Sequence, residues 1–254
     1  MVLYEKKERV AYITLNRPEK FNAIDRKTTE ELIKVWADFK EDNNLWVAIL
    51  NGKGKSFCAG ADLSEMEVGK TWSLSKSLLY GERRMGPSNQ KVWKPLIAAV
   101  HGLVLGAGLY LTLESDFRIA SEEAEFGLPE PRVSLPTLFT PFLSQYLLHT
   151  HALELLLIGD RVKASRAYEI GLVNRVVPLE GLLSTAEQFA HRMCENGPLA
   201  LRAMKEAFYS SRGMEFSGVL KLMEEIFAPV FRSGDAVEGK SAFLEKRKPK
   251  WKGK

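Results

Sequence analysis

The sequence has few of the features that mark secreted, metal-binding or membrane-spanning proteins. Its 254 residues include two cysteines, Cys58 and Cys194, in no Cys-x-x-Cys pattern. Neither a disulfide framework nor a zinc site is therefore expected, and a reducing compartment fits. The first ten residues, MVLYEKKERV, lack the apolar core of a signal peptide. We therefore expect a cytoplasmic globular protein that binds no metal.

A uniformly basic surface is absent as well. The formal net charge is +4, but residues 245–254 hold six Lys or Arg and one Glu, so the rest of the chain is close to neutral. Nucleic-acid binding is not expected from this distribution, although RNA binding by the tail is a rival hypothesis. The tail is either a solvated terminus or a segment that meets a phosphorylated ligand or an acidic neighbouring subunit.

Hydrophobic periodicity alternates between strand and helix in the first half of the chain and is mostly helical from Thr137 onward. A helix is expected over residues 25–42, with Asp25 or Thr28 as its N-cap. This order predicts an α/β core followed by a helical C-terminal region. The strands are expected at residues 9–18, 45–52, 95–102, 116–121 and 173–178, and later helices at 151–159, 164–172, 183–197, 199–210 and 216–227.

Residues 96–113 carry no charged side chain and raise three alternatives. A membrane span needs roughly 20 apolar residues in one helix, whereas this segment contains three glycines and is followed by Glu114 and Asp116. A dinucleotide loop needs a third glycine where Leu111 stands, and a phosphate-binding loop at GKS needs a glycine where Ile49 stands. A strand, a glycine turn and a buried helix explain the segment best.

Two glycine loops and one acidic residue are the candidate chemistry. The loops are SFCAGADL at residues 56–63 and GLVLGAG at residues 102–108, and each follows a predicted strand. Main-chain N–H groups from two such loops can converge on one oxygen, which is the plan of an oxyanion hole. Glu130 stands between Pro129 and Pro131, which restrict its backbone. Taken singly, each loop reads as an ordinary turn and Glu130 as a surface residue.

Together, these motifs resemble a known family. ITLNRPEKFNAID, FCAGADL, IAAVHGLVLGAGLYL, SDFRIASEEAEFGLPE, GDRVKASRAYEIGLVNRVVP and AFLEKRKPKWKG occur in the order and spacing of the crotonase superfamily, also called the enoyl-CoA hydratase/isomerase family. Only residues 64–93 diverge. The resemblance implies an α/β fold, a crotonase-like spiral of ββα units over residues 1–195. The resemblance further implies a helical C-terminal trimerisation region over residues 196–254. The expected assembly is a homotrimer or a dimer of trimers.

The resemblance also implies catalytic positions. In this family two backbone N–H groups hold a thioester oxygen, and the matching donors are those of Ala61 and Ala107. Hydratases of the family use two glutamates, and the matching positions are Tyr110 and Glu130. Only one carboxylate is therefore retained, while Tyr110 is a neutral donor or a pocket-lining aromatic residue.

That single carboxylate favours one reaction over its rivals. Enoyl-CoA double-bond isomerisation with Glu130 as the sole acid/base is the main expectation, because moving a double bond needs one base. Hydration of an enoyl-CoA, including a cyclic or dienoyl thioester, by Glu130 alone is the alternative. Thioester hydrolysis, decarboxylation and a non-catalytic acyl-CoA binder stay open.

Coenzyme A enters as part of the substrate, and no further cofactor is implied. Three of the matching positions lie on a C-terminal region that often comes from a neighbouring subunit. The implied CoA-binding positions are Lys20, Phe21, Ala23, Ala59, Asp62, Leu63, Phe227, Phe243 and Lys246.

Two departures from the family pattern concern the acyl end of the site. Glu114 lies four residues after Tyr110 on the predicted helix. It is expected to pair with Arg118 or Arg132, or else to replace the missing acid from one turn deeper. The Pro-Gly pair usual in the family seven residues after the glutamate is replaced by Pro136 and Thr137, one residue early. The position of Glu130 relative to the acyl chain is therefore less closely specified.

Overall fold

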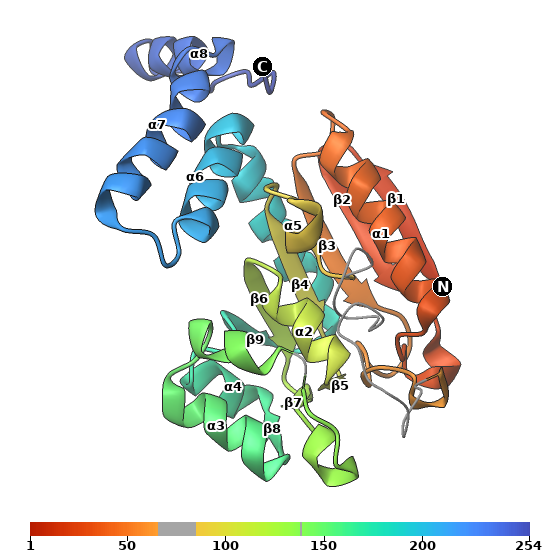
Figure 1. Cartoon of the computed structure of the whole chain (residues 1–254). Coiled ribbons are helices and arrows are strands. Elements are labelled where there is room, and N and C mark those ends of the chain that lie inside the picture. The colour runs from red at the N-terminus through yellow and green to blue at the C-terminus, as the bar shows by residue number, and fades with distance from the viewer. Residues whose placement is uncertain (66–84, 138) are drawn as a thin grey trace.

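A six-stranded sheet forms the centre of the fold (Figure 1). The computed structural model describes residues 1–65, 85–137 and 139–254. The strand order is β1-β2-β3-β4-β6-β9, with β1 antiparallel to β2 and the other neighbours parallel. The strands are β1 (Val2–Lys7), β2 (Val10–Leu15), β3 (Val47–Gly52), β4 (Leu96–Val100), β6 (Phe117–Ser121) and β9 (Arg175–Val177).

Strands β2, β3, β4, β6 and β9 lie inside the predicted ranges, whereas β1 was not predicted. Four of the six β1 positions are exposed and the other two are half-buried, so the sequence there carries little hydrophobic pattern. The strand forms because Glu8 turns the chain with a positive φ of 52°, which brings β1 antiparallel to β2.

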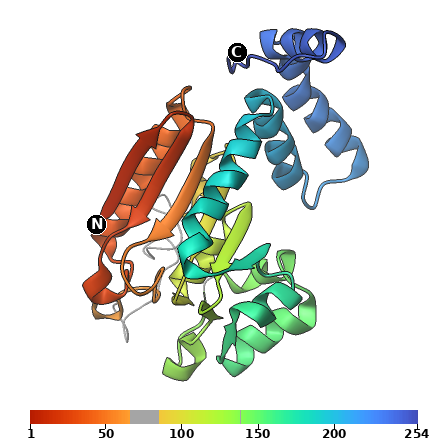
Figure 2. The same ribbon diagram turned by 180° about the vertical axis from the view of Figure 1, so that it is seen from behind.

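Helices cover both faces of this sheet. Helix α1 (Arg26–Glu41) packs Leu32 and Trp36 into one core cluster, and helix α5 (Leu182–Cys194) packs into another on the opposite face (Figure 2). Strand β3 is buried on both sides, as parallel strands between two helical layers are. The Asp25 carboxylate caps α1 by accepting a hydrogen bond from Thr28 N at 2.7 Å. This confirms one of the two predicted caps.

A second, three-stranded sheet joins the first and gives the chain its spiral path. It consists of β5 (Leu103–Leu105), β7 (Glu125–Gly127) and β8 (Arg161–Lys163). Each of β4 and β6 in the larger sheet is followed by a strand of the smaller sheet, and α2 (Ala107–Leu113) follows β5. The uncharged segment thus contains the predicted strand, turn and helix, plus one short strand within the turn. No described helix is long and apolar enough to cross a membrane.

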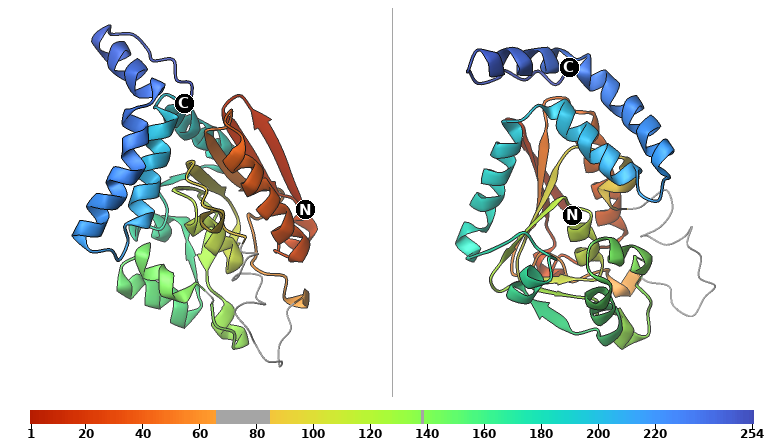
Figure 3. Two further views of the ribbon diagram at one scale, coloured as in Figure 1. Left: turned by 45° about the horizontal axis from the view of Figure 1, so that its top comes forward. Right: turned by 90° about the vertical axis from the view of Figure 1, so that its left-hand side faces the viewer.

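The remaining elements are mostly helical. Helices α7 and α8 extend away from the sheet (Figure 3), whereas α6 stays beside it, with Lys205 2.7 Å from Asp116 Oδ2. The α-helices are α3 (His149–Ile158), α4 (Ala164–Glu169), α6 (Pro198–Ser210), α7 (Phe216–Phe231) and α8 (Gly234–Leu244). The 3-10 helices are η1 (Pro18–Lys20), η2 (Leu63–Glu65), η4 (Pro87–Gln90), η5 (Glu130–Val133), η6 (Thr140–Gln145) and η7 (Leu179–Gly181).

The basic tail is hydrogen-bonded to the rest of the chain, while all of its Lys and Arg side chains are exposed to solvent. The Asp235 carboxylate accepts from Lys252 N and Gly253 N, both at 2.8 Å. Trp251 Nε1 donates to Glu195 O at 2.8 Å. The Asp235 carboxylate and the Glu195 carbonyl of the same chain therefore hold the tail, and the charge pattern alone did not indicate them.

One buried amide fixes the loop that leads from β2 to α1. The Asn22 side chain is 2% exposed, and its Oδ1 accepts from Arg17 N at 2.8 Å. Its Nδ2 donates to Lys53 O at 2.9 Å and to Ser56 O at 2.8 Å. Asn22 thus ties the first loop to the segment that follows β3.

Replacing Asn22 by Ala is expected to lower the free energy of unfolding by about 2–3 kcal/mol, because buried backbone groups of the Arg17, Lys53 and Ser56 residues lose their partner. Urea unfolding measures the change. Asn196→Ala is the matched control, because that amide is exposed and makes one bond to Arg192 O at 3.2 Å. A loss at position 22 no larger than the loss at position 196 would contradict this role.

Candidate active site

The two glycine loops predicted to carry the chemistry lie side by side because one pairs with β5. Cys58 N donates to Leu103 O at 2.9 Å, and Leu105 N donates to Cys58 O at 3.0 Å. The chain segment before Gly60 therefore runs parallel to the strand that leads into Gly106. This pairing brings loops more than forty residues apart in sequence to one place, as the oxyanion-hole hypothesis requires.

Gly60 and Gly106 allow the loops to approach each other closely. Both have positive φ, 114° for Gly60 and 48° for Gly106, which is a conformation that L side chains rarely adopt. A Cβ built on Gly60 would lie 3.4 Å from Leu105 O and 4.0 Å from Ala107 N. A Cβ built on Gly106 would lie 3.7 Å from Gly60 Cα. The two backbones are therefore in contact, with no side chain between them.

The Ala61 and Ala107 N–H groups both lie at this contact. Around Ala61, Ile24 N donates to Gly60 O at 2.8 Å and Asp62 N donates to Ile24 O at 2.9 Å. The N–H of Ala61 faces the other way, because successive N–H groups of an extended chain point to opposite sides. Ala107 opens α2, so its N–H has no acceptor within the helix. Within residues 1–65, 85–137 and 139–254, neither N–H donates to a protein acceptor.

The Glu130 carboxyl lies against the same glycine turn. A Cβ built on Gly106 would lie 2.6 Å from Glu130 Oε1, so the turn and the carboxyl are in direct contact. Glu130 Oε2 is buried and has no hydrogen-bond partner among the described residues. Glu130 is therefore a group of this site, and its alternative reading as a surface turn residue is wrong.

Burial raises the pKa of the Glu130 carboxyl above its ordinary value. Hydrogen bonds with its own backbone and with the Thr137 side chain oppose that rise but are weaker. Glu130 is the first residue of helix η5 and lies between Pro129 and Pro131, which restrict the backbone there. The structure thus holds the desolvated Glu130 carboxyl in a fixed direction beside the Ala61 and Ala107 N–H groups, which donate to no acceptor among the described residues.

The predicted CoA-binding positions near the N-terminus gather at the rim of the site. Ala59 N donates to Phe21 O at 2.9 Å, and Ala23 N donates to Lys20 O at 3.0 Å. Lys20 is exposed, while Phe21 and Leu63 are 47% and 56% exposed. These positions form one solvent-facing edge beside the Ala61 loop.

An arginine that the motif analysis did not single out holds this edge together. Arg17 lies 3.0 Å from an Asp25 carboxylate oxygen and 3.2 Å from an Asp62 carboxylate oxygen. The Asp62 carboxylate also accepts from the Ser64 hydroxyl at 2.6 Å, and that hydrogen bond lowers its pKa. Asp62 is therefore tied into the loop itself. The sequence offered no signal for the Arg17–Asp62 ion pair, because these two residues lie 45 positions apart.

The C-terminal positions do not join this site within one chain. Phe227 lies on α7, Phe243 on α8, and Lys246 just beyond α8, and these helices lie at the opposite end of the chain from β5 and β7 (Figure 1). The Phe243 side chain is 83% exposed. One chain therefore brings together the first six predicted CoA-binding positions and leaves the last three apart.

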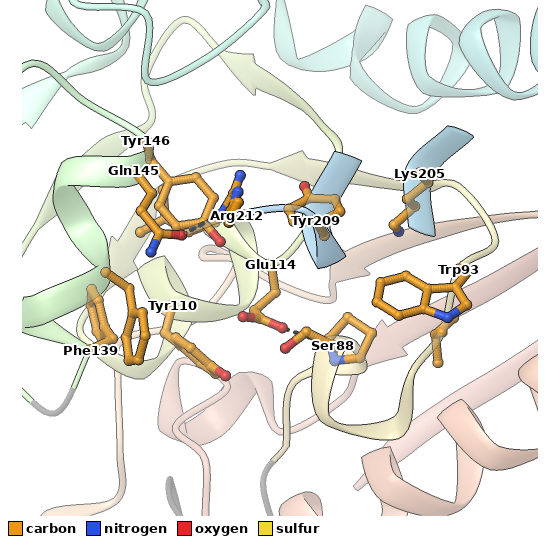
Figure 4. A pocket seen from close by; sticks show the side chains of 14 residues that line it. Ser88, Trp93, Tyr110, Glu114, Phe139, Gln145, Tyr146, Lys205, Tyr209 and Arg212 are labelled. Carbon is orange, nitrogen blue, oxygen red and sulfur yellow. Dashed lines mark hydrogen bonds between the residues drawn. The ribbon is translucent and has the colours of Figure 1, made fainter. Parts of the chain in front are cut away.

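A cavity of about 180 Å³ begins one helical turn beyond Ala107. Tyr110 and Glu114 line it from α2, Phe139 and Tyr146 lie beside η6, and Ser88 belongs to η4 (Figure 4). Helix α6 contributes Lys205 and Tyr209. Glu130 and the two alanine donors are not among the lining residues, and Tyr110 is the lining residue that follows Ala107 by one turn of α2.

The predicted pairing of Glu114 with Arg118 or Arg132 is wrong. Arg118 donates to Leu172 O and Ser115 O, both at 2.7 Å, and Arg132 pairs with Asp160. Glu114 Oε2 instead accepts from Ser88 N at 3.1 Å (Figure 4). The helix period correctly placed Glu114 on the Tyr110 side of α2, but the competing backbone acceptors of both arginines could not be read from the sequence.

Comparisons with known proteins point to one family. A family model described as Enoyl-CoA hydratase/isomerase matches residues 5–254. A short-chain-enoyl-CoA hydratase of Clostridium acetobutylicum is 36% identical, with 97% of this chain and 95% of that protein covered. An (E)-benzylidenesuccinyl-CoA hydratase of Thauera aromatica is 35% identical, with 99% of each chain covered. A solved enoyl-CoA hydratase of Mycobacterium tuberculosis H37Rv has a TM-score of 0.91 at 36% identity, covering 100% of this chain and 99% of that one.

Replacing Glu130 by Gln is expected to stabilise the protein at neutral pH and not at acidic pH. Because the folded state raises this pKa, the native protein binds more protons than the unfolded chain, and its stability falls as pH rises from the unfolded pKa through the folded pKa. The variant avoids that loss, so its Tm advantage should grow between about pH 4 and pH 7. Thermal unfolding of both proteins across this range measures the difference. A constant or shrinking Tm difference would show that the carboxyl is not desolvated.

Proposed function

The chain is an enzyme of the enoyl-CoA hydratase/isomerase family, and we propose that it adds water across the double bond of an enoyl-CoA thioester. The observation that carries the proposal is the desolvated Glu130 carboxyl in contact with the Gly106 turn, next to the Ala107 N–H. The hydratase names of the relatives also favour water addition. Coenzyme A takes part as the thioester portion of the substrate, and the proposed reaction needs no further cofactor.

The first step is the binding of the thioester oxygen by the Ala61 and Ala107 N–H groups. Water attack on the β-carbon pushes electrons onto this oxygen, so negative charge develops between the two donors. Donors that are fixed before the reaction stabilise this charge without reorganising, and one such donor is typically worth about 3 kcal/mol of barrier. The positive N-terminal end of α2 adds to the effect.

The second requirement is a proton acceptor that also returns the proton. The Glu130 carboxylate takes a proton from the attacking water while the water oxygen bonds to the β-carbon. The resulting acid then gives that proton to the α-carbon as the enolate collapses, so the double bond gains one water in total. A carboxyl whose pKa is raised by burial is suited to both transfers near neutral pH.

Tyr110 is assigned a different role from the glutamate that family hydratases have at this position. A phenol with an ordinary pKa of about 10 is neutral at pH 7 and donates a hydrogen bond, so it is a poor general base. Its ring centroid lies 5.5 Å from that of Phe139, and both rings line the cavity. Tyr110 therefore orients the substrate at the entrance to the cavity.

Isomerisation of the double bond is the second candidate, and a specific observation supports it. Glu130 is the one carboxylate among the described residues that contacts the Gly106 turn, and moving a double bond needs one base that takes and returns a proton. Isomerisation is the main expectation from the sequence, whereas the hydratase names of the relatives support hydration, which we therefore propose first.

The proposal assigns coenzyme A to the rim formed by Lys20, Phe21, Ala23, Ala59, Asp62 and Leu63. Phe227, Phe243 and Lys246 would then reach the nucleotide from a neighbouring subunit of a trimer or a dimer of trimers. The position of α7 and α8 away from the site supports this arrangement, because one chain alone cannot bring these residues to its own rim (Figure 3).

Glu130→Gln is expected to lower kcat for water addition to crotonyl-CoA by about 10²- to 10⁴-fold, because the amide cannot accept and return the proton. Mass spectrometry of the product distinguishes the two reactions: hydration adds the mass of one water, whereas isomerisation of a Δ3-enoyl-CoA gives an isobaric product. Glu123→Gln is the control, because Glu123 is exposed in the turn after β6. Undiminished turnover by the Glu130 variant would exclude both reactions as written.

A further inference from the structure

The cavity beyond Tyr110 has the size and lining of a site for one aromatic ring (Figure 4). Its volume of about 180 Å³ compares with roughly 150 Å³ for a known cavity that binds benzene. The Tyr110 and Phe139 rings form one wall, with centroids 5.5 Å apart and an interplanar angle of 37°. Trp93 and Tyr146 line other sides. Flat apolar walls of this kind favour a planar ring over a flexible chain.

Glu114 lies too deep in this cavity to act on the reacting carbons. Glu114 is the C-cap of α2 and lies seven positions after Ala107. The rise of an α-helix therefore separates the two backbones by about 10 Å along the helix axis. With a thioester oxygen at the Ala107 N–H, the α- and β-carbons lie within the first turn, beside Glu130. The far end of the acyl group then lies near Glu114, so this carboxylate meets the distal substituent and not the double bond.

The Glu114 carboxylate is the acceptor that the cavity offers to a ligand. Its Oε2 accepts from Ser88 N at 3.1 Å, and no Lys or Arg of the described chain forms an ion pair with it. The cations that line the cavity are held elsewhere. Lys205 lies 2.7 Å from Asp116 Oδ2 and donates to Lys94 O at 3.0 Å.

Arg212, the other lining cation, is also engaged by its neighbours. It donates to Gln145 Oε1, and its guanidinium carbon lies 4.6 Å from the centroid of the Tyr209 ring. A ligand hydroxyl is therefore better matched to this cavity than a ligand carboxylate. The hydroxyl donates to the Glu114 carboxylate, whereas a second carboxylate would face a like charge.

We propose that Glu114 is a specificity-determining residue that selects acyl groups ending in a hydroxyl-bearing aromatic ring, by accepting a hydrogen bond from that hydroxyl. The inference rests on the proposed function for the placement of the thioester oxygen. The ring site itself is tested by binding alone, without turnover.

The test measures the Kd of unreactive saturated thioesters by titration calorimetry on the full chain. The ligands are 3-phenylpropanoyl-CoA, its three ring-hydroxylated isomers, and the methoxy counterpart of the tightest isomer. One hydroxyl isomer is expected to bind about 10- to 100-fold more tightly than the unsubstituted ring, because a hydrogen bond to a charged group is worth about 1.5–3 kcal/mol. The methoxy ligand has no donor and is expected to lose this gain. Equal Kd values for all five ligands would overturn the proposal.

A variant series assigns the preference to one side chain. Glu114→Leu is expected to bind the hydroxylated and unsubstituted ligands within about twofold of each other, and Glu114→Gln to show an intermediate ratio. Glu41→Leu, at the exposed end of α1, is the control and keeps the wild-type ratio. A full preference in Glu114→Leu would overturn the assignment. Should that variant not fold, the hydroxyl and methoxy ligands on the wild-type chain decide.

Failure of the proposed function gives a different result. If neither crotonyl-CoA nor the α,β-unsaturated form of the tightest ring ligand gains water while the hydroxyl preference is present and depends on Glu114, the hydratase proposal fails and the ring site stands. If crotonyl-CoA is hydrated but no hydroxyl isomer binds more tightly, the ring site fails and the hydratase proposal stands.

Discussion

The backbone contact between Gly60 and Gly106 is the constraint on which the site depends. Both residues have positive φ, and a side chain on Gly106 would meet the Glu130 carboxyl at 2.6 Å. The pairing of Cys58 with β5 delivers the first loop to this contact, and β5 delivers the second. Ala61, Ala107 and Glu130 come together because no Cβ separates the two backbones. The proposed catalysis therefore depends on close packing of the main chain at these two glycines.

The same contact explains why an acid can be kept where it costs stability. Glu130 Oε2 is buried without a partner among the described residues, and its burial raises the pKa of the carboxyl. The surrounding fold tolerates that cost because the sheet is covered on both faces and the loops are anchored by Asn22 and Arg17. Desolvation of a carboxyl thus occurs at the place where chemistry is proposed, which is usual for enzymes.

Much of the architecture could be predicted from the sequence, because long periodic segments such as residues 25–42 and the uncharged run after Pro95 carry their own signal. The family resemblance predicts that Ala61, Ala107 and Glu130 share one site. Three features were not readable. Strand β1 is too exposed to show a pattern. The Arg17–Asp62 ion pair joins residues 45 positions apart. The orientation of Glu114 toward Ser88 depends on where two arginines find backbone acceptors. Each of these depends on tertiary neighbours, which local periodicity does not encode.

The most direct measurement of the central claim is a crystal structure of the protein with a saturated acyl-CoA thioester. The account predicts that the thioester oxygen lies about 2.7–3.1 Å from both the Ala61 and the Ala107 nitrogens. It also predicts that a Glu130 carboxyl oxygen faces the α-carbon. A thioester oxygen bound away from either nitrogen, or a Glu130 carboxyl turned to solvent in the complex, would contradict it.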